Sequence, residues 1–291
     1  MRKMKRISAF GVFTALCIFL AMLTGCSESV PQETVTQSEE QSVSEMRETH
    51  DMQERETIST EEETGEYVTI GDEEYSIDLT ELVLSYNWLT DEDIKDIGKI
   101  TKLTKLDLTG NYITDLSPLS GLTNLTELNL EDNELTDITF ISGLENLTEL
   151  YLFNNNISDI TPISELVNLT ELRLSCNNIS DITPVSELTN LTKLEIDTNK
   201  ISDIRPLSGL TNLNCLVFYD NPIRDISSLS ELTELTTLGF DTYDSTDINL
   251  LSHFTKLKEL NINELYEMTD EEKEHLKNML PNCNIYYFIF N

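Results

Sequence analysis

An unbroken 22-residue repeat predicts that this chain of 291 residues folds as a leucine-rich repeat solenoid. Leucine recurs eight times at this spacing, and each copy is followed by a second leucine three residues later, at positions 103, 125, 147, 169, 191, 213, 235 and 257. The unit at 103–124 contains the pattern L-x-x-L-x-L-x-x-N. Units of this kind stack into a long sheet whose concave face suits the binding of another macromolecule.

Each unit is expected to contribute one short strand to a parallel sheet, because apolar and variable positions alternate within the leucine pattern. In the unit at 103–124, Leu106 and Leu108 should point into the core. Lys105, Asp107 and Thr109 should point out from the opposite face of the strand. That outward face is the expected concave surface.

Two polar columns mark the turns that follow the strands. The first is asparagine, whose side chain can satisfy the backbone groups of its own turn and the next, at 111, 133, 155, 177, 199 and 221. The second is aspartate, which suits the cap of a short 3₁₀ turn in the return segment, at 115, 137, 159, 181, 203 and 225. A calcium ladder is the alternative for the aspartates, but they lack the clustered carboxylates that calcium requires.

Both ends of the array depart from the repeat, as expected of capping units. Residues 67–78 alternate around a Gly-Asp turn and predict a β-hairpin cap, and the repeats then occupy residues 79–265. The first unit is 24 residues long, and Ile94 and Ile97 in its return segment are spaced as one face of a helix. Residues 266–291 predict a C-terminal cap of one helix followed by one strand.

The first 66 residues belong to a different class of chain. Residues 1–25 combine a basic start with an apolar run and predict an export signal, and Leu23-Thr24-Gly25-Cys26 spans its end. This ending resembles the lipobox of bacterial lipoproteins, in which Cys26 would be acylated and become the new N-terminus; an ordinary signal peptide is the alternative. Residues 26–66 are polar and acidic, and we expect a disordered, lipid-anchored tether.

The chain is strongly acidic. Its formal net charge is -34, and residues 67–291 carry 40 Asp and Glu against 13 Lys and Arg. Such a surface repels nucleic acid and anionic lipid headgroups, and it favours a basic or neutral protein partner. The alternative is that the charge only keeps a surface protein soluble.

The sequence contains no constellation that indicates catalysis or metal binding. Its three histidines, His50, His253 and His275, have no cysteine or histidine partners at ligand spacing, and no glycine-rich phosphate loop is present. We therefore expect a protein that is not an enzyme and requires no cofactor. We also expect a monomer.

The variable strand positions contain the candidate binding site. Most are polar, and against that background the candidate ligand-binding residues are Tyr151, Phe153, Arg173, Val217 and Tyr219. Aromatic residues and arginine on a rigid exposed sheet are the residue types that dominate interface energetics. Two alternatives remain: cross-strand aromatic pairs that stabilise the sheet itself, or an extension that folds back over them.

The 22-residue unit with N-x-I-[ST]-D-I-x-P-L resembles the repeats of the internalins, bacterial surface proteins whose concave faces bind host receptors. The resemblance covers residues 79 to about 265. Internalins typically have a helical cap, an immunoglobulin-like domain and a C-terminal sorting motif, whereas this chain predicts a hairpin cap, a helix-and-strand end and a lipid anchor. It is therefore similar to the broader group of internalin-like leucine-rich repeat lipoproteins of Gram-positive bacteria, and no receptor-contacting residue of the internalins can be assigned here.

Three functions are consistent with this organisation. The first is an extracellular binding module, anchored by lipid to the membrane of a bacterium, that captures a host or bacterial protein through its concave face. The second is a scaffold of the cell envelope. The third is a glycan-binding adhesin, in which the aromatic residues serve as stacking platforms.

Overall fold

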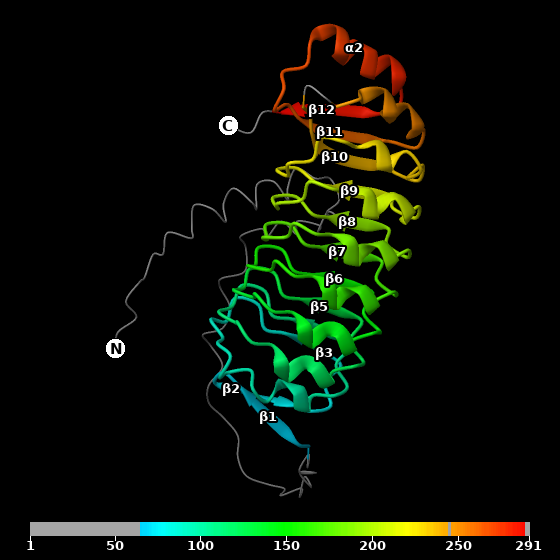
Figure 1. Cartoon of the computed structure of the whole chain (residues 1–291). Coiled ribbons are helices and arrows are strands. Elements are labelled where there is room, and N and C mark those ends of the chain that lie inside the picture. The colour runs from blue at the N-terminus through cyan, green and yellow to red at the C-terminus, as the bar shows by residue number, and fades with distance from the viewer. Residues whose placement is uncertain (1–64, 244–245, 289–291) are drawn as a thin grey trace, which may run out of the picture.

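The computed structural model describes residues 65–243 and 246–288 (Figure 1). The predicted signal segment, Cys26 and nearly all of the predicted tether lie outside the described residues. Within them, ten strands form one parallel sheet in sequence order, as the repeat predicted. Its strands are β3 (Glu81–Val83), β4 (Lys105–Asp107), β5 (Glu127–Asn129), β6 (Glu149–Tyr151), β7 (Glu171–Arg173), β8 (Lys193–Glu195), β9 (Cys215–Val217), β10 (Thr237–Asp241), β11 (Glu259–Asn263) and β12 (Asn284–Phe288).

The return segments carry short 3₁₀ helices, which stack along one side of the sheet (Figure 1). They are η2 (Ile97–Lys99), η3 (Ser117–Gly121), η4 (Thr139–Gly143), η5 (Thr161–Glu165), η6 (Thr183–Glu187), η7 (Arg205–Gly209), η8 (Ser227–Leu229) and η9 (Ile248–His253). The solenoid predicted from the repeat is confirmed.

The caps agree with the sequence at both ends. Strands β1 (Tyr67–Ile70) and β2 (Glu73–Ser76) form an antiparallel hairpin, with Gly71 at φ +60° in the turn. At the other end, α2 (Asp270–Met279) begins with a reciprocal capping box between Thr269 and Glu272. Strand β12 then pairs with β11 and extends the sheet.

The helix predicted in the first return segment is wrong. The structure has turns there, followed only by η2, although Ile94 and Ile97 are fully buried as expected. Parallel strands lie about 4.8 Å apart, whereas an α-helix is about 10 Å across, so a slimmer 3₁₀ turn fits the stack more closely. The contact is tight, because a Cβ atom added to Gly98 would lie 2.3 Å from the carbonyl oxygen of Pro118 in the next unit.

The asparagine column forms a hydrogen-bonded ladder between units. Asn155 is representative: its Nδ2 donates to the carbonyl oxygens of Leu130, Leu152 and Phe153, at 2.9, 3.3 and 3.3 Å. Its Oδ1 accepts from the backbone amide of Leu135 at 3.0 Å. The ladder therefore satisfies its own turn and the preceding one, whereas the sequence had suggested the next one.

The aspartate column caps the 3₁₀ turns, as predicted. In each case Oδ1 accepts from the backbone amide two residues later, for example from Thr161 to Asp159 at 2.8 Å and from Ser117 to Asp115 at 2.8 Å. Hydrogen bonds from Thr161 lower the pKa of Asp159, and those from the side chain and amide of Arg205 lower the pKa of Asp203 to about 2. These carboxylates are thus used for local structure.

The core is a continuous apolar column beneath the sheet. It runs from Val68 and Ile70 in the hairpin to Leu276 in α2, and the repeat leucines between them are almost completely buried. Each inner leucine layer packs on its neighbours, so the units stabilise one another as expected for a solenoid. In the part of the chain that the structure describes, no helix is long and apolar enough to cross a membrane.

Candidate functional site

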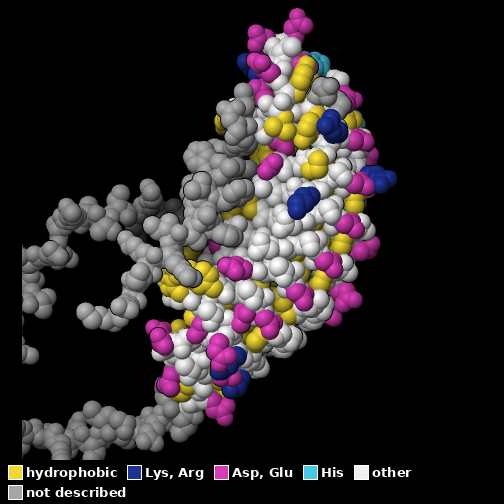
Figure 2. All heavy atoms as spheres, turned by 60° about the vertical axis from the view of Figure 1, so that its left-hand side comes forward, with side chains coloured by type: hydrophobic (Ala, Val, Ile, Leu, Met, Phe, Trp, Pro, Cys, Tyr) yellow, Lys and Arg dark blue, Asp and Glu magenta, His cyan; other side chains and the backbone are white. Residues whose placement is uncertain are grey.

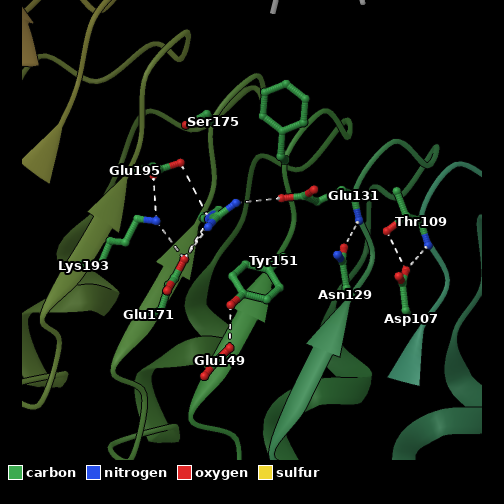
Figure 3. Close-up of polar contacts among 12 residues, drawn as sticks. Asp107, Thr109, Asn129, Glu131, Glu149, Tyr151, Glu171, Ser175, Lys193 and Glu195 are labelled. Carbon is green, nitrogen blue, oxygen red and sulfur yellow. Dashed lines mark hydrogen bonds and ion pairs between the residues drawn. The ribbon is translucent and has the colours of Figure 1, made fainter. Parts of the chain in front are cut away.

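The outward side chains of the ten strands form the open face of the sheet, which is the predicted concave face. Because the strands are in register, equivalent positions align in columns, and Tyr151 pairs with Arg173 and Arg173 with Glu195. Figure 3 shows a network of aromatic and charged side chains from β5 to β8 at this level. This central part of the open face is the candidate site.

Arg173 lies at the centre of the network. Its Nη2 is 2.7 Å from Glu171 Oε1, its Nε is 3.8 Å from Glu195 Oε2, and its Nη1 is 4.0 Å from Glu131 Oε1. Lys193 joins the same carboxylates, with its Nζ 3.1 Å from Glu171 Oε1 and 3.3 Å from Glu195 Oε1. These contacts hold the guanidinium in one place before any ligand arrives, which reduces the entropy lost on binding.

Tyr151 is fixed by two of its neighbours. The guanidinium carbon of Arg173 lies 4.8 Å from the centre of its ring, a cation–π contact, and its hydroxyl donates to Glu149 Oε2 at 2.5 Å (Figure 3). Burial, followed by the hydrogen bond to Glu149 and the nearby carboxylates, raises the pKa of Tyr151 well above its usual range. The phenol therefore stays protonated and acts as a hydrogen-bond donor.

The site has an excess of negative charge. Arg173 and Lys193 form ion pairs with Glu131, Glu171 and Glu195, and Glu149 adds a fourth carboxylate through its hydrogen bond from Tyr151. Burial raises the pKa of Glu131 to about 7; the guanidinium of Arg173 opposes this shift. Charge at this position therefore changes near neutral pH.

Further buried carboxylates continue along the open face. Asp197 accepts a hydrogen bond from the Ser175 hydroxyl. Burial raises the pKa of Asp197 to about 7, although this hydrogen bond acts to lower it. Asp241 accepts from Asn263 Nδ2 at 2.6 Å, and burial raises its pKa to about 6. Figure 2 shows Asp and Glu side chains spread over the visible face of the molecule, with fewer Lys and Arg.

The structure divides the five predicted site residues into two groups. Tyr151 and Arg173 are in contact, and Phe153 lies just beyond the end of the same strand as Tyr151; all three are partly exposed. Val217 and Tyr219, by contrast, are 0% and 2% exposed, so the expectation that they face solvent is wrong.

The Tyr219 side chain lies across the neighbouring strands and does not point toward solvent. Its ring contacts Phe288 at a centroid distance of 5.4 Å, and its hydroxyl donates to the carbonyl oxygen of Asn261 at 3.3 Å. It passes over Gly239, where an added Cβ would lie 2.4 Å from the tyrosine oxygen. Val217 belongs to the same small apolar cluster. Cross-strand packing, one of the two alternatives for these residues, is thus present in the described structure.

Sequence reasoning missed a second group of aromatic residues, at the hairpin end. Tyr86, Trp88 and Tyr112 are 65%, 73% and 50% exposed. A signal was present, because Tyr112 follows the ladder asparagine Asn111 and Trp88 follows Asn87, the asparagine at the same position of the first unit. The prediction did not include these residues because they lie beyond the strand positions that define the open face.

Among the described residues, no three His, Cys, Asp or Glu side chains are grouped so that they could hold a metal ion. The candidate site offers instead an aromatic ring, a stacked guanidinium and several carboxylates, fixed against one another. Groups arranged in this way suit the recognition of a complementary surface.

The comparisons with known proteins agree with this architecture. The family model for leucine-rich repeats (2 copies) matches residues 77–121, 123–165 and 167–209. Internalin C2 of Listeria monocytogenes is similar at 34% sequence identity, over 66% of this chain and 86% of that protein, with a TM-score of 0.61. The chain belongs to the internalin-like leucine-rich repeat proteins.

Other solved structures show the same fold at greater distance from this internalin-like chain. A leucine-rich repeat protein of Leptospira interrogans is 28% identical over 66% of this chain, which spans 50% of that protein, with a TM-score of 0.57. A plant peptide hormone receptor is 24% identical over 75% of this chain and 36% of its own length, with a TM-score of 0.57. At this identity the similarity indicates a shared fold and nothing about function. No curated protein sequence matches the chain significantly.

Proposed function

We propose that this internalin-like chain captures a protein ligand through the open face of its sheet, with Tyr151, Phe153 and Arg173 at the centre of the contact. The observation that carries the proposal is the stacked and ion-paired arrangement of Tyr151 and Arg173 in the middle of a rigid sheet. The Leu core already holds the strands together, so these side chains are not needed for folding.

The electrostatics specify the kind of ligand. Carboxylates outnumber cations within the network, and the chain as a whole carries a net charge of -34. Long-range attraction then accelerates association with a basic partner, while short-range contacts with the aromatic rings determine how long it stays bound. The proposed ligand is thus a protein with a basic or neutral surface, and the proposed role involves no catalysis.

The proposed setting is the outer surface of a bacterial cell. It rests on the lipobox-like Leu23-Thr24-Gly25-Cys26 and on the acidic segment that follows. Acyl chains on Cys26 would anchor the chain in the membrane, and the tether would leave the solenoid free to meet its ligand.

The anchor can be tested by replacing Cys26 with Ala. Metabolic labelling with a radioactive or clickable fatty acid should mark the wild-type chain and leave Cys26→Ala unlabelled. A wild-type mature N-terminus at any residue other than Cys26 would contradict the proposal.

The binding role can be tested with a photoreactive phenylalanine analogue at position 153. Irradiation in the presence of surface-protein extracts, from the bacterium and from candidate hosts, should yield a covalent adduct whose partner is then identified. The matched control carries the same analogue at Val167, an exposed apolar residue just after η5 on the return side. Adducts that form equally from both positions would show that the open face is not selective.

A further inference from the structure

The hairpin end of the solenoid exposes an aromatic patch outside the candidate site. It consists of Tyr86, Trp88 and Tyr112, of which Trp88 is 73% exposed. The Trp88 and Tyr112 rings are 5.9 Å apart and tilted by 38°, so they form one continuous surface across two units. Grouped exposed aromatic rings are uncommon on monomeric proteins unless they contact a partner.

The backbone presents these rings instead of burying them. Tyr86 occupies a left-handed position that recurs in later units, with φ 57°, and its ring lies over Gly110, where an added Cβ would be 2.3 Å from two ring carbons. Trp88 is also left-handed, with φ 61°, at a position where no later unit has this conformation among the described residues. A bulky residue is strained in this conformation, yet Trp88 is 73% exposed, so the backbone holds the ring toward solvent.

Carboxylates surround the patch on two sides. On the open-face side, burial followed by the charges of Asp132, Glu131 and Asp107 raises the pKa of Tyr86. On the other side, Trp88 borders a hollow of about 320 Å³ between the hairpin and the first unit, and its acidic lining residues are Asp72, Glu73 and Asp93.

No lysine or arginine lines this hollow in the described structure. The lysines at this end of the solenoid are engaged elsewhere, because each forms an ion pair with its own carboxylate: Lys95 with Glu92, Lys99 with Asp96, Lys102 with Asp78 and Lys105 with Glu127. The carboxylates of the hollow form no ion pair with a lysine or arginine of the described chain, although Glu73 accepts a hydrogen bond from Tyr75 and Asp93 accepts two from Thr90. A cation from outside therefore meets no competing cation of the protein in the hollow.

We infer that Tyr86, Trp88 and Tyr112 bind arginine side chains of an extended basic segment of the protein ligand. A guanidinium stacks on the face of an indole or phenol ring and at the same time forms ion pairs with carboxylates beside it. The rings belong to the first two units, and the carboxylates around them belong to the hairpin and the first three units. This inference rests on the proposed function, because it assumes that the chain has a protein ligand. It adds that this ligand has an arginine-bearing segment and makes a second contact, at the hairpin end.

The test uses the intrinsic fluorescence of Trp88, which is the one tryptophan in the sequence. The full chain is titrated with the peptide acetyl-Gly-Arg-Gly-Arg-Gly-Arg-Gly-amide, and with the same peptide in which glutamine replaces arginine. The arginine peptide should change the emission of Trp88 in a saturable way that weakens with added salt, and the glutamine peptide should not.

Variants separate stacking from general attraction to an acidic protein. Trp88→Ala and Tyr112→Ala leave the net charge unchanged, and each should weaken binding of the arginine peptide by about fivefold in calorimetry. Trp88→Phe should keep affinity within about twofold, because a ring remains. The matched control is Tyr286→Ala, which removes a tyrosine that is 51% exposed in β12 at the opposite end.

Two results would overturn the inference. One is equal affinity of all four variants for the arginine peptide, since binding would then be unspecific attraction between charges. The other is a change in Trp88 emission with soluble oligosaccharides but none with the arginine peptide, which would assign the rings to a glycan. If either occurs while the adduct at position 153 still forms, the inference fails and the proposed function stands.

Discussion

Replacing Asn155 with Ala tests whether the asparagine ladder holds consecutive units together. The side chain makes four hydrogen bonds, but three of the groups that it contacts keep another partner. The carbonyl oxygens of Leu130 and Leu152 also accept from the ladder asparagines on either side, Asn133 and Asn177, and that of Phe153 accepts from a backbone amide. The cost therefore depends mainly on the fourth group.

That fourth group is the backbone amide of Leu135, for which Asn155 Oδ1 is the acceptor at 3.0 Å. A buried amide left without an acceptor costs about 1–3 kcal/mol, and the weakened carbonyl contacts add to this. We expect Asn155→Ala to lower the free energy of unfolding by about 2–3 kcal/mol in urea denaturation followed by circular dichroism.

The adjacent Asn156 provides a matched control. Its side chain is exposed, and Asn156→Ala should change stability by no more than about 0.5 kcal/mol. Asn155→Asp tests the acceptor and the donor of the side chain separately. It keeps the oxygen that accepts from the Leu135 amide but replaces the donor with an oxygen that faces three carbonyl oxygens. It should lower the free energy of unfolding at least as much as Asn155→Ala does. Equal stability of the Asn155→Ala and Asn156→Ala variants would refute the ladder.

Two further predictions concern the open face. Because burial raises the pKa of Glu131 from 4.5 to about 7, the folded state binds this proton more tightly than the unfolded state, and the free energy of unfolding should fall as pH rises from about 4.5 to 7. Glu131→Gln should flatten that profile in urea titrations, and parallel profiles would contradict the assignment. Gly239→Ala places a methyl group 2.4 Å from the oxygen of Tyr219 and should cost about 1–3 kcal/mol by thermal melting. Gly209→Ala, where an added Cβ meets nothing within 4 Å, should be nearly neutral, and equal losses would show that Tyr219 does not occupy this space.

The regular part of the fold could be predicted from the sequence because each unit depends only on its neighbours. The positions of Leu106, Asn155 and Asp159 follow from the 22-residue period, and so does the pairing of Tyr151 with Arg173 in adjacent strands. Where the period holds, sequence spacing converts directly into spatial register.

The errors lie where the period breaks or where a contact spans several units. The burial of Tyr219 depends on the absence of a side chain at Gly239 and on Phe288, which belongs to the C-terminal cap and not to a repeat. Trp88 and Tyr112 follow the asparagine of their units, beyond the strand positions from which the open face was predicted, so the prediction did not include them. Neither outcome could be read from one unit alone.

The central claim is that the ligand binds around Tyr151 on the open face, and one pair of dissociation constants tests it most directly. Binding of the partner captured at position 153 is measured for Tyr151→Ala and for Val167→Ala, which removes an exposed apolar side chain from the return side. We predict that Tyr151→Ala raises the dissociation constant by about 30-fold, equivalent to about 2 kcal/mol, with little change in melting temperature, while Val167→Ala binds as the wild type does. Wild-type affinity of Tyr151→Ala together with loss of binding in Val167→Ala would place the contact on the return side and contradict the account.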